Sequence, residues 1–216
     1  MTFDEQRSHM VESQLVARGL KGERLIAAFR KVPRHLFIPP EFQIEAYADH
    51  PLPIGAGQTI SQPYIVALMT DALRLQGHER VLEIGGGSGY QTAILAEMVL
   101  EVFSVERLPE LLSTARRRLS ALGYTNIHST MGNGSLGWPE HAPYDAILVS
   151  AAAPEVPNPL LAQLGESGRM VLPIGLADTQ MLIQVERRNG AVHRRELASC
   201  VFVPLVGQHG WPATGT

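Results

Sequence analysis

The strongest constraint on the fold is a glycine-rich turn that joins a short apolar segment to a helix-like one. The apolar residues 81–84 (VLEI) are followed at once by residues 85–89 (GGGSG), and residues 91–99 then have a helical pattern. A short apolar run that ends in glycines is typical of a buried parallel strand. Turns of this kind lie at the carboxyl edge of a parallel sheet, where such folds bind ligands. The turn therefore predicts an α/β fold with a ligand site beside these glycines.

The rest of the chain continues this alternation of strand-like and helix-like segments. After the glycines, strands are predicted over 101–106, 127–133, 144–152 and 168–175, and helices over 109–122 and 157–164. Strands that alternate with crossover helices form right-handed βαβ units. We therefore predict a doubly wound, Rossmann-like sheet.

The two ends of the chain have other patterns. Residues 176–179 are too few for a helical crossover, and Asn189-Gly190 is a strong hairpin signal, so strands over 181–188 and 196–206 are predicted to run antiparallel at the sheet edge. This gives about seven strands. Residues 1–45 have helix-like apolar spacing.

Residues 49–63 are so rich in proline and glycine that we expect an irregular surface loop there, and helix resumes over 64–75. We expect a single domain over 1–216. It consists of N-terminal helices and a substrate loop (1–79), a ligand-binding core (80–175) and antiparallel edge strands (176–216).

Composition narrows the functional class. With 216 residues, 45% of them hydrophobic, the chain is long enough for one domain with a full core. A net charge of −3 does not resemble the basic footprint of a nucleic-acid binder. The single cysteine, Cys200, excludes an intramolecular disulfide and favours a reducing compartment. We find neither a signal peptide nor an apolar run long enough to span a membrane, so we expect a cytoplasmic protein with no nucleic-acid or membrane partner.

The glycine spacing distinguishes between classes of nucleotide-like ligand. The dinucleotide pattern G-x-G-x-x-G/A fails whether counted from Gly85 or from Gly86, which argues against an NAD-dependent dehydrogenase. The observed spacing, E-x-G-x-G-x-G beginning at Glu83, resembles that of S-adenosylmethionine methyltransferases. Glu106, seventeen residues after Gly89 at the end of the next predicted strand, is placed to accept the hydroxyls of a ribose.

Each of these features has a simpler interpretation. The glycines could form only a tight turn, and Glu106 could be a solvated surface residue. Asn133-Gly134, at the end of the third predicted strand, is placed to meet an adenine edge but by itself is more typical of a turn.

Nearly the whole chain resembles one family, the protein-L-isoaspartate (D-aspartate) O-methyltransferases. The resemblance rests on segments from MVESQLVARGL to FVPLVG, including VPRHLFIPPEF, VLEIGGGSGYQTAILA and GRMVLPIG. PIGAGQTISQP is the most discriminating of them, because general methyltransferases share the glycine loop but not this stretch. The resemblance implies transfer of a methyl group from S-adenosylmethionine, leaving S-adenosylhomocysteine, to the free α-carboxylate of isoaspartyl residues in damaged proteins.

The resemblance also implies roles for matching positions. Ser61 aligns with the active-site serine. The cofactor is expected to contact Glu83, Gly85, Gly87, Gly89, Glu106, Asn133 and Gly134. The substrate peptide is expected to contact Ile60, Ser61, Val203 and Leu205, the last two through their main chain. Two positions depart from the family pattern: Asn133 replaces the usual aspartate, which we expect to weaken cofactor binding, and Val201 replaces an arginine common in bacterial members, which we expect to alter peptide preference.

The implied chemistry needs neither a metal nor a general base. An isoaspartyl α-carboxylate has a pKa of about 3.5–4, so it is already ionised at neutral pH. Ser61 is expected to orient it, with the residue 49–63 segment closing over the site; the alternative for Ser61 is an N-cap of the following helix. Two other functions remain open, a methyltransferase that esterifies another peptide carboxylate and a non-catalytic binder of isoaspartyl proteins. We expect a monomer.

Overall fold

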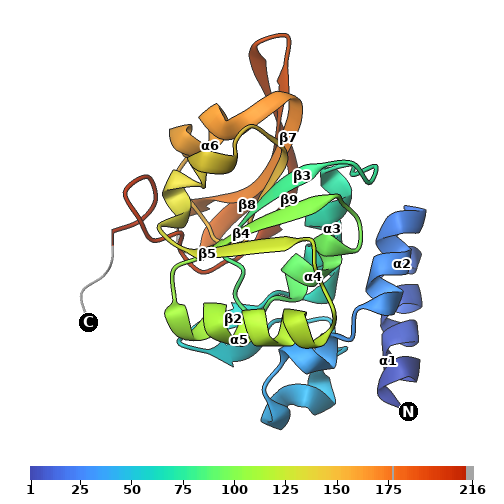
Figure 1. Cartoon of the computed structure of the whole chain (residues 1–216). Helices are drawn as coiled ribbons and strands as arrows, with labels where there is room; N and C mark the ends of the chain where they lie inside the picture. The colour runs from blue at the N-terminus through green and yellow to red at the C-terminus, as the bar shows by residue number, and fades with distance from the viewer. Residues whose placement is uncertain (177, 213–216) are drawn as a thin grey trace.

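The computed structural model describes residues 1–176 and 178–212, and a seven-stranded sheet runs through its centre (Figure 1). The strands are β3 (Arg80–Ile84), β4 (Glu101–Glu106), β5 (Ile127–Met131), β6 (Tyr144–Val149), β7 (Leu164–Leu176), β8 (Thr179–Arg188) and β9 (Ala191–Cys200). Their order is β5-β4-β3-β6-β7-β8-β9. The first five in sequence are parallel, whereas β8 and β9 form antiparallel pairs at the edge. The predicted α/β sheet with an antiparallel C-terminal edge is therefore confirmed.

The order of the strands in the sheet determines where a ligand site is expected. The chain runs outward from β3 to β4 and β5 on one side, then returns to β6 on the other side of β3. This reversal makes the carboxyl ends of β3 and β6 a topological switch point, the usual place for a ligand in an open α/β sheet. The end of β3, at Ile84, pairs with Val105 of β4 and Val149 of β6. The loops that follow these three strands therefore begin side by side.

Alternating strand residues build a core on each face of the sheet. Leu82 and Phe103 lie in one buried cluster, with Leu160 of α6 (Asn158–Gln163), whereas Val81 and Val102 lie in the other. The second cluster includes residues of α3 (Pro63–Ala72), α4 (Tyr90–Ala96) and α5 (Pro109–Ala121). Figure 1 shows α6 on the opposite side of the sheet from α4 and α5. Because both faces are covered, the central strands β3 and β6 are buried and largely apolar.

The N-terminal region is helical, as predicted, and packs against α4. It contains α1 (Phe3–Met10), a π turn (Val11–Leu15), α2 (Glu23–Lys31) and 3₁₀ turns at Val16–Arg18, Arg34–Phe37 and Pro40–Glu45. Phe29 and Phe37 meet the ring of Tyr90 edge-on, with ring centroids 6.2 and 5.6 Å away. The fully buried guanidinium of Arg34 lies over the same ring at 4.9 Å. Since Tyr90 directly follows the glycine loop, this packing fixes the start of α4.

Two sequence predictions were wrong in detail. The segment 49–63 is not irregular: β1 (Leu52–Gly55) and β2 (Gln58–Ile60) form a two-stranded hairpin. Its turn contains three consecutive residues of positive φ, at positions 55–57, so the glycines that suggested a loop instead make the hairpin turn. The strand predicted over 196–206 ends at Cys200. The residues after it leave the sheet, and Pro204 forms a single bridge with Ala152.

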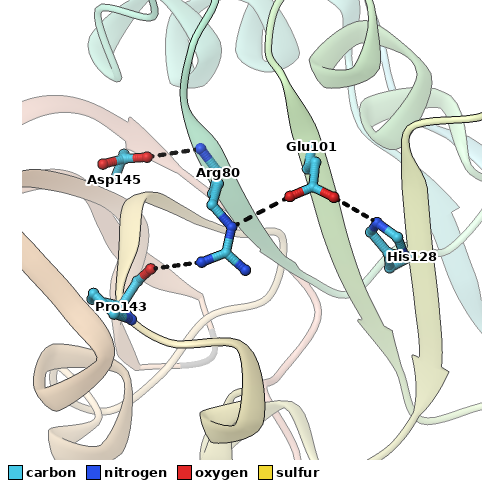
Figure 2. A network of polar contacts seen from close by, with 5 residues as sticks. All are labelled: Arg80, Glu101, His128, Pro143 and Asp145. Carbon is cyan, nitrogen blue, oxygen red and sulfur yellow. Dashed lines mark hydrogen bonds and ion pairs between the residues drawn. The ribbon is translucent and has the colours of Figure 1, made fainter.

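A polar network ties the amino ends of four strands together, at the edge opposite the ligand site (Figure 2). The main-chain N–H of Arg80 donates to Asp145 (2.8 Å), and the Arg80 side chain contacts Glu101 and the carbonyl oxygen of Pro143. His128 Nε2 lies 3.0 Å from the other Glu101 oxygen, and this hydrogen bond is the main cause of a lowered Glu101 pKa. Because these side chains are partly exposed, the network adds little stability. None of the helices in the described part of the chain is long and apolar enough to cross a membrane.

Candidate active site

A cavity of about 280 Å³ opens at the carboxyl ends of β3, β4 and β6. Three regions far apart in the sequence form its walls: the glycine loop 85–88, the hairpin and the residues just after it (54–61), and the C-terminal segment 203–206. Residues 105–108 at the end of β4 close another side. The predicted site residues Ile60, Ser61, Gly85, Gly87, Glu106, Gly134, Val203 and Leu205 all line it. The remaining three, Glu83, Gly89 and Asn133, do not.

The glycine loop brings bare backbone up to the cavity. Gly85 has φ +84° and Gly87 has φ +53°, in the left-handed region that disfavours residues with a Cβ. The Gly85 N–H donates to the Val105 carbonyl at 2.8 Å, so the loop begins as a continuation of the sheet. Gly89 instead lies at the N-cap of α4, where an added Cβ would sit 3.2 Å from Ala115 of α5. Gly85 and Gly87 thus admit a ligand, whereas Gly89 lets two helices pack closely.

Glu106 connects the end of β4 to the glycine loop. Its side chain is buried and accepts hydrogen bonds from the main-chain N–H groups of Gly87 and Leu108, both at 2.9 Å. An ionised carboxylate offers about four acceptor positions, so capacity remains for two ribose hydroxyls. This arrangement fits the predicted role, and the two backbone bonds hold the carboxylate at the cavity wall.

Glu83 supports the loop from beneath rather than lining the cavity. It is fully buried, and its Oε2 accepts hydrogen bonds from Thr92 Oγ1 (2.6 Å) and Ser104 Oγ (2.7 Å). Its Oε1 has no hydrogen-bond partner among the described residues. Burial raises the pKa of Glu83 to about 7. Glu83 therefore holds the residues around the loop in place, and its direct contact with the cofactor stays a prediction.

We expect Glu83 to make the protein less stable as pH rises from about 4.3 to about 7. Its folded pKa lies above the value of an unfolded glutamate, so in this window the folded state binds more protons and the free energy of unfolding falls with pH. The Glu83→Gln variant is expected to lose this part of the pH dependence. Thermal unfolding at pH 5 and pH 8 measures it.

Glu186→Gln is the control, because the pKa of Glu186 is lowered and its ion-pair partners are Arg169 and Arg188, and arginine does not titrate in that window. Equal changes in Tm between pH 5 and pH 8 for the wild type and Glu83→Gln would contradict the expectation.

Asn133 lies beside Gly134 of the cavity wall, and its side-chain oxygen holds the C-terminal segment. Its Oδ1 accepts hydrogen bonds from both the N–H (3.1 Å) and the Oγ (2.8 Å) of Ser135, and Ser135 Oγ in turn accepts from the His209 N–H at 3.0 Å. A carbonyl oxygen has two lone pairs, and both are used here. Asn133 Oδ1 therefore has no remaining acceptor position for an adenine amino group, and the contact of this side chain with the cofactor stays a prediction. The neighbouring Gly134 does line the cavity.

We expect Asn133→Asp to bind S-adenosylhomocysteine about three- to tenfold more tightly. The carboxylate keeps an acceptor for Ser135 and places a second, charged acceptor where the amide nitrogen lies, and charge-assisted bonds are stronger than neutral ones. Titration calorimetry measures the change. Weaker binding by the variant would show that the amide nitrogen itself is needed.

Ser61 lies between the hairpin and α3, and it does not cap that helix. The N-cap position is Gln62, which makes no side-chain capping bond; the Asp49 carboxylate instead accepts from the Tyr64 N–H at 3.3 Å. Among the described residues, the Ser61 hydroxyl has no hydrogen-bond partner, and Ser61 lines the cavity. The capping alternative is therefore wrong, and the hydroxyl is available to a ligand.

The C-terminal segment contributes side chains to the cavity. Three of its main-chain groups are already paired: Val203 O accepts from Ala152 N, Leu205 N donates to Ala152 O (both 2.8 Å), and Leu205 O accepts from Trp211 N at 2.7 Å. These main-chain groups of Val203 and Leu205, which were predicted to contact a substrate peptide, are thus already hydrogen-bonded within the protein. Val201, just outside, is 72% exposed.

Several residues that line the cavity were not predicted from the sequence. Tyr90, Met69 and Leu111 line the cavity from three helices, and Arg107 and Leu108 follow Glu106. Only Tyr90 had a usable signal, its place directly after the last glycine of the loop. Within the described ranges, no group of three or more His, Cys, Asp or Glu residues is arranged to hold a metal ion.

The residues present fit S-adenosylmethionine. An added Cβ at Gly86 would come within 2.6 Å of Ser104 Oγ, and one at Gly134 would lie 2.4 Å from Ile84, so both backbones pass too close to their neighbours for any side chain. Bare backbone beside a fixed carboxylate suits an adenosine with free ribose hydroxyls and no phosphate.

Comparisons with known proteins agree with this geometry. Residues 5–210 match the model of the family described as protein-L-isoaspartate(D-aspartate) O-methyltransferase. A protein-L-isoaspartate O-methyltransferase of Methanoculleus marisnigri is 54% identical over 206 residues, covering 95% of this chain and 94% of the relative. A Syntrophobacter fumaroxidans protein of the same name is 53% identical over 211 residues, covering 98% and 99%.

Solved structures give the same result. One protein-L-isoaspartate O-methyltransferase superposes with a TM-score of 0.83 at 29% identity, covering 94% of this chain and 67% of that one. A Plasmodium falciparum protein, described as a beta-aspartate methyltransferase in complex with S-adenosyl-L-homocysteine, superposes with a TM-score of 0.79 at 27% identity, covering 92% and 96%.

Proposed function

The chain belongs to the protein-L-isoaspartate(D-aspartate) O-methyltransferase family, and we propose that Ser61 and the residues around it direct its methyl transfer to the free α-carboxylate of L-isoaspartyl residues. The protein is an S-adenosylmethionine-dependent methyltransferase. The observation that carries the proposal is that one cavity is lined both by the glycine loop with Glu106 and by Ser61. Cofactor and carboxylate can therefore meet in a single enclosed space.

The reaction depends on alignment. S-adenosylmethionine supplies a methyl group on a positively charged sulfur, and the substrate carboxylate is already ionised at neutral pH. No residue has to remove a proton. The protein holds the oxygen, the methyl carbon and the sulfur in line, an effect that can supply up to about 7–11 kcal/mol.

Each part of the cavity wall has a role in this alignment. Glu106 binds the ribose, and the bare backbone of Gly85 and Gly87 lets the cofactor approach. The Ser61 hydroxyl donates a hydrogen bond to the substrate carboxylate. The apolar side chains of Ile60 and Leu205, both buried, exclude water from the reacting atoms. The amide nitrogen of the isoaspartyl linkage then attacks the methyl ester spontaneously, methanol leaves and a succinimide forms, and hydrolysis of the succinimide gives normal aspartate in part of the molecules.

We further propose that the enzyme acts as a monomer in the cytoplasm, without nucleic-acid or membrane partners. The net charge of −3 and the single cysteine support this assignment. Two other functions predict different behaviour. A methyltransferase for another peptide carboxylate would leave an isoaspartyl peptide unlabelled, and a non-catalytic binder would bind the peptide without transferring a methyl group.

Labelled methyl transfer to an isoaspartyl peptide, measured for the wild type and Ser61→Ala, tests the proposal. We expect base-labile label with the wild type and a kcat about 10- to 100-fold lower with Ser61→Ala, since a hydrogen bond to a charged group contributes about 1.5–3 kcal/mol. Affinity for S-adenosylhomocysteine is expected to change less than about twofold. An unchanged kcat in Ser61→Ala would refute the role of this serine.

A further inference from the structure

The Asp49 carboxylate joins three segments of the chain next to Ser61. Its Oδ2 accepts hydrogen bonds from Arg18 Nη1 and Gln62 Nε2, both at 2.9 Å, and its Oδ1 accepts from the Tyr64 N–H at 3.3 Å. We propose that Asp49 is a positioning residue for methyl transfer, which holds Ser61 in the cavity in the orientation that the substrate carboxylate requires. The inference rests on the proposed role of Ser61.

Ser61 is a single residue between two fixed points. On one side Ile60 pairs with Leu52 in the hairpin, and on the other the Gln62 side chain is bound to Asp49. Asp49 lies only three residues before Leu52. Its carboxylate therefore bonds back across the base of the hairpin to the start of α3, which fixes the chain direction on both sides of Ser61.

Asp49 also replaces Ser61 at the end of the helix. A serine just before a helix commonly uses its hydroxyl to cap the first N–H groups. Here Asp49 supplies the acceptor for Tyr64 N, and its negative charge lies at the positive end of the helix dipole. The Ser61 hydroxyl is left without an internal partner, which is the state needed to bind a substrate.

Arg18 holds Asp49 in turn. Its guanidinium carbon lies 3.2 Å from the centroid of the Tyr64 ring while Nη1 bonds the carboxylate. The Asp49 side chain is 27% exposed, so the pair is partly shielded from solvent and is stronger than a fully exposed one. Because Arg18 contacts both Asp49 and Tyr64, the N-terminal region, the hairpin and α3 are bound together at this point.

The test compares Asp49→Ala, Asp49→Asn, Ser61→Ala and the double variant Asp49→Ala with Ser61→Ala. The three readouts are the kcat with an isoaspartyl peptide, the Kd of S-adenosylhomocysteine and the Tm. We expect Asp49→Ala to lower kcat about 30-fold while the Kd stays within about threefold of the wild type. Asp49→Asn keeps one acceptor oxygen and is expected to lose about fivefold. In the double variant the losses are expected not to multiply, because Asp49 acts through Ser61, and kcat should stay within about threefold of the slower single variant.

Glu12→Ala is the matched control. It removes a carboxylate of the N-terminal region that pairs with Arg30, away from the hairpin, and is expected to leave kcat unchanged. The proposal is overturned if kcat of Asp49→Ala stays within twofold of the wild type, if the losses multiply in the double variant, or if the affinity for S-adenosylhomocysteine and the Tm fall in parallel with kcat. Should Asp49→Ala fail to fold, Asp49→Asn is combined with Ser61→Ala under the same criteria. A wild-type enzyme inactive on the peptide would instead refute the proposed function.

Discussion

Replacing Gly85 by valine is expected to weaken S-adenosylhomocysteine binding at least about 100-fold, or about 2.7 kcal/mol. The backbone of Gly85 has φ +84°, a conformation that is costly for any residue with a Cβ and more so for a branched one. The added Cβ would already contact Ser150 at 3.6 Å, so the valine methyl groups have to extend into the cavity that the cofactor occupies. Titration calorimetry measures the loss.

The Gly190→Val variant separates the effect of backbone strain from the effect of a side chain that extends into the cavity. Gly190 also has positive φ, +74°, but lies at the tip of the β8–β9 hairpin with no atoms within 4 Å of an added Cβ. This control is expected to lower Tm without changing the affinity for S-adenosylhomocysteine. Equal affinities for Gly85→Val and the wild type would mean that the cofactor does not lie against this loop.

Replacing Glu106 by alanine is expected to weaken S-adenosylhomocysteine binding about 100- to 1000-fold. The change removes the proposed bonds to the ribose hydroxyls, each contributing about 1.5–3 kcal/mol because the acceptor is charged. It also leaves the N–H groups of Gly87 and Leu108 without their acceptor, so the loop that faces the cofactor loses its tie to β4. Calorimetry gives the affinity, and kcat at saturating cofactor is expected to fall much less.

Glu106→Gln provides a graded comparison. It keeps one acceptor oxygen and the shape of the side chain but loses the charge, so a loss of about tenfold is expected. If the Glu106→Ala and Glu106→Gln variants bind S-adenosylhomocysteine equally well, and within about threefold of the wild type, the ribose is held elsewhere in the cavity.

The fold was largely predictable from the sequence because parallel strands covered on both faces are apolar along most of their length. Val81 to Ile84, apart from Glu83, and Ile147 to Val149 are such runs, and the first is followed by glycines typical of a turn. The β8–β9 hairpin was predicted from Asn189-Gly190, whose positive φ angles of 53° and 74° are those of a tight hairpin turn.

The errors in the fold have physical reasons. The β1–β2 hairpin was missed because its glycines and prolines are also the residues of irregular loops, and only the pairing of Leu52 with Ile60 distinguishes the two. The end of β9 was misplaced because residues 202–205 are extended in either case. Their main chain pairs with Ala152 instead of β8. The alternation of apolar and polar residues in the sequence does not show with which segment a strand pairs.

Some residues of the candidate site could also be predicted from the sequence, and others could not. Gly85 and Glu106 were predicted because Gly85 directly follows β3 and Glu106 ends β4, so their position at the sheet edge follows from the fold. Asn133 was given an adenine contact on the same grounds, but its oxygen is occupied by Ser135, two residues away. Asp49 could not be predicted, since its bond with Arg18 spans 31 positions and exists only once the N-terminal region has packed against α3.

The most direct test of the account is labelled methyl transfer from S-adenosylmethionine to two peptides of identical sequence, one with an isoaspartyl and one with a normal aspartyl linkage. We expect base-labile label on the isoaspartyl peptide alone, followed by conversion of this peptide through the succinimide to the aspartyl form. Equal labelling of both peptides, or of the aspartyl peptide alone, would contradict it.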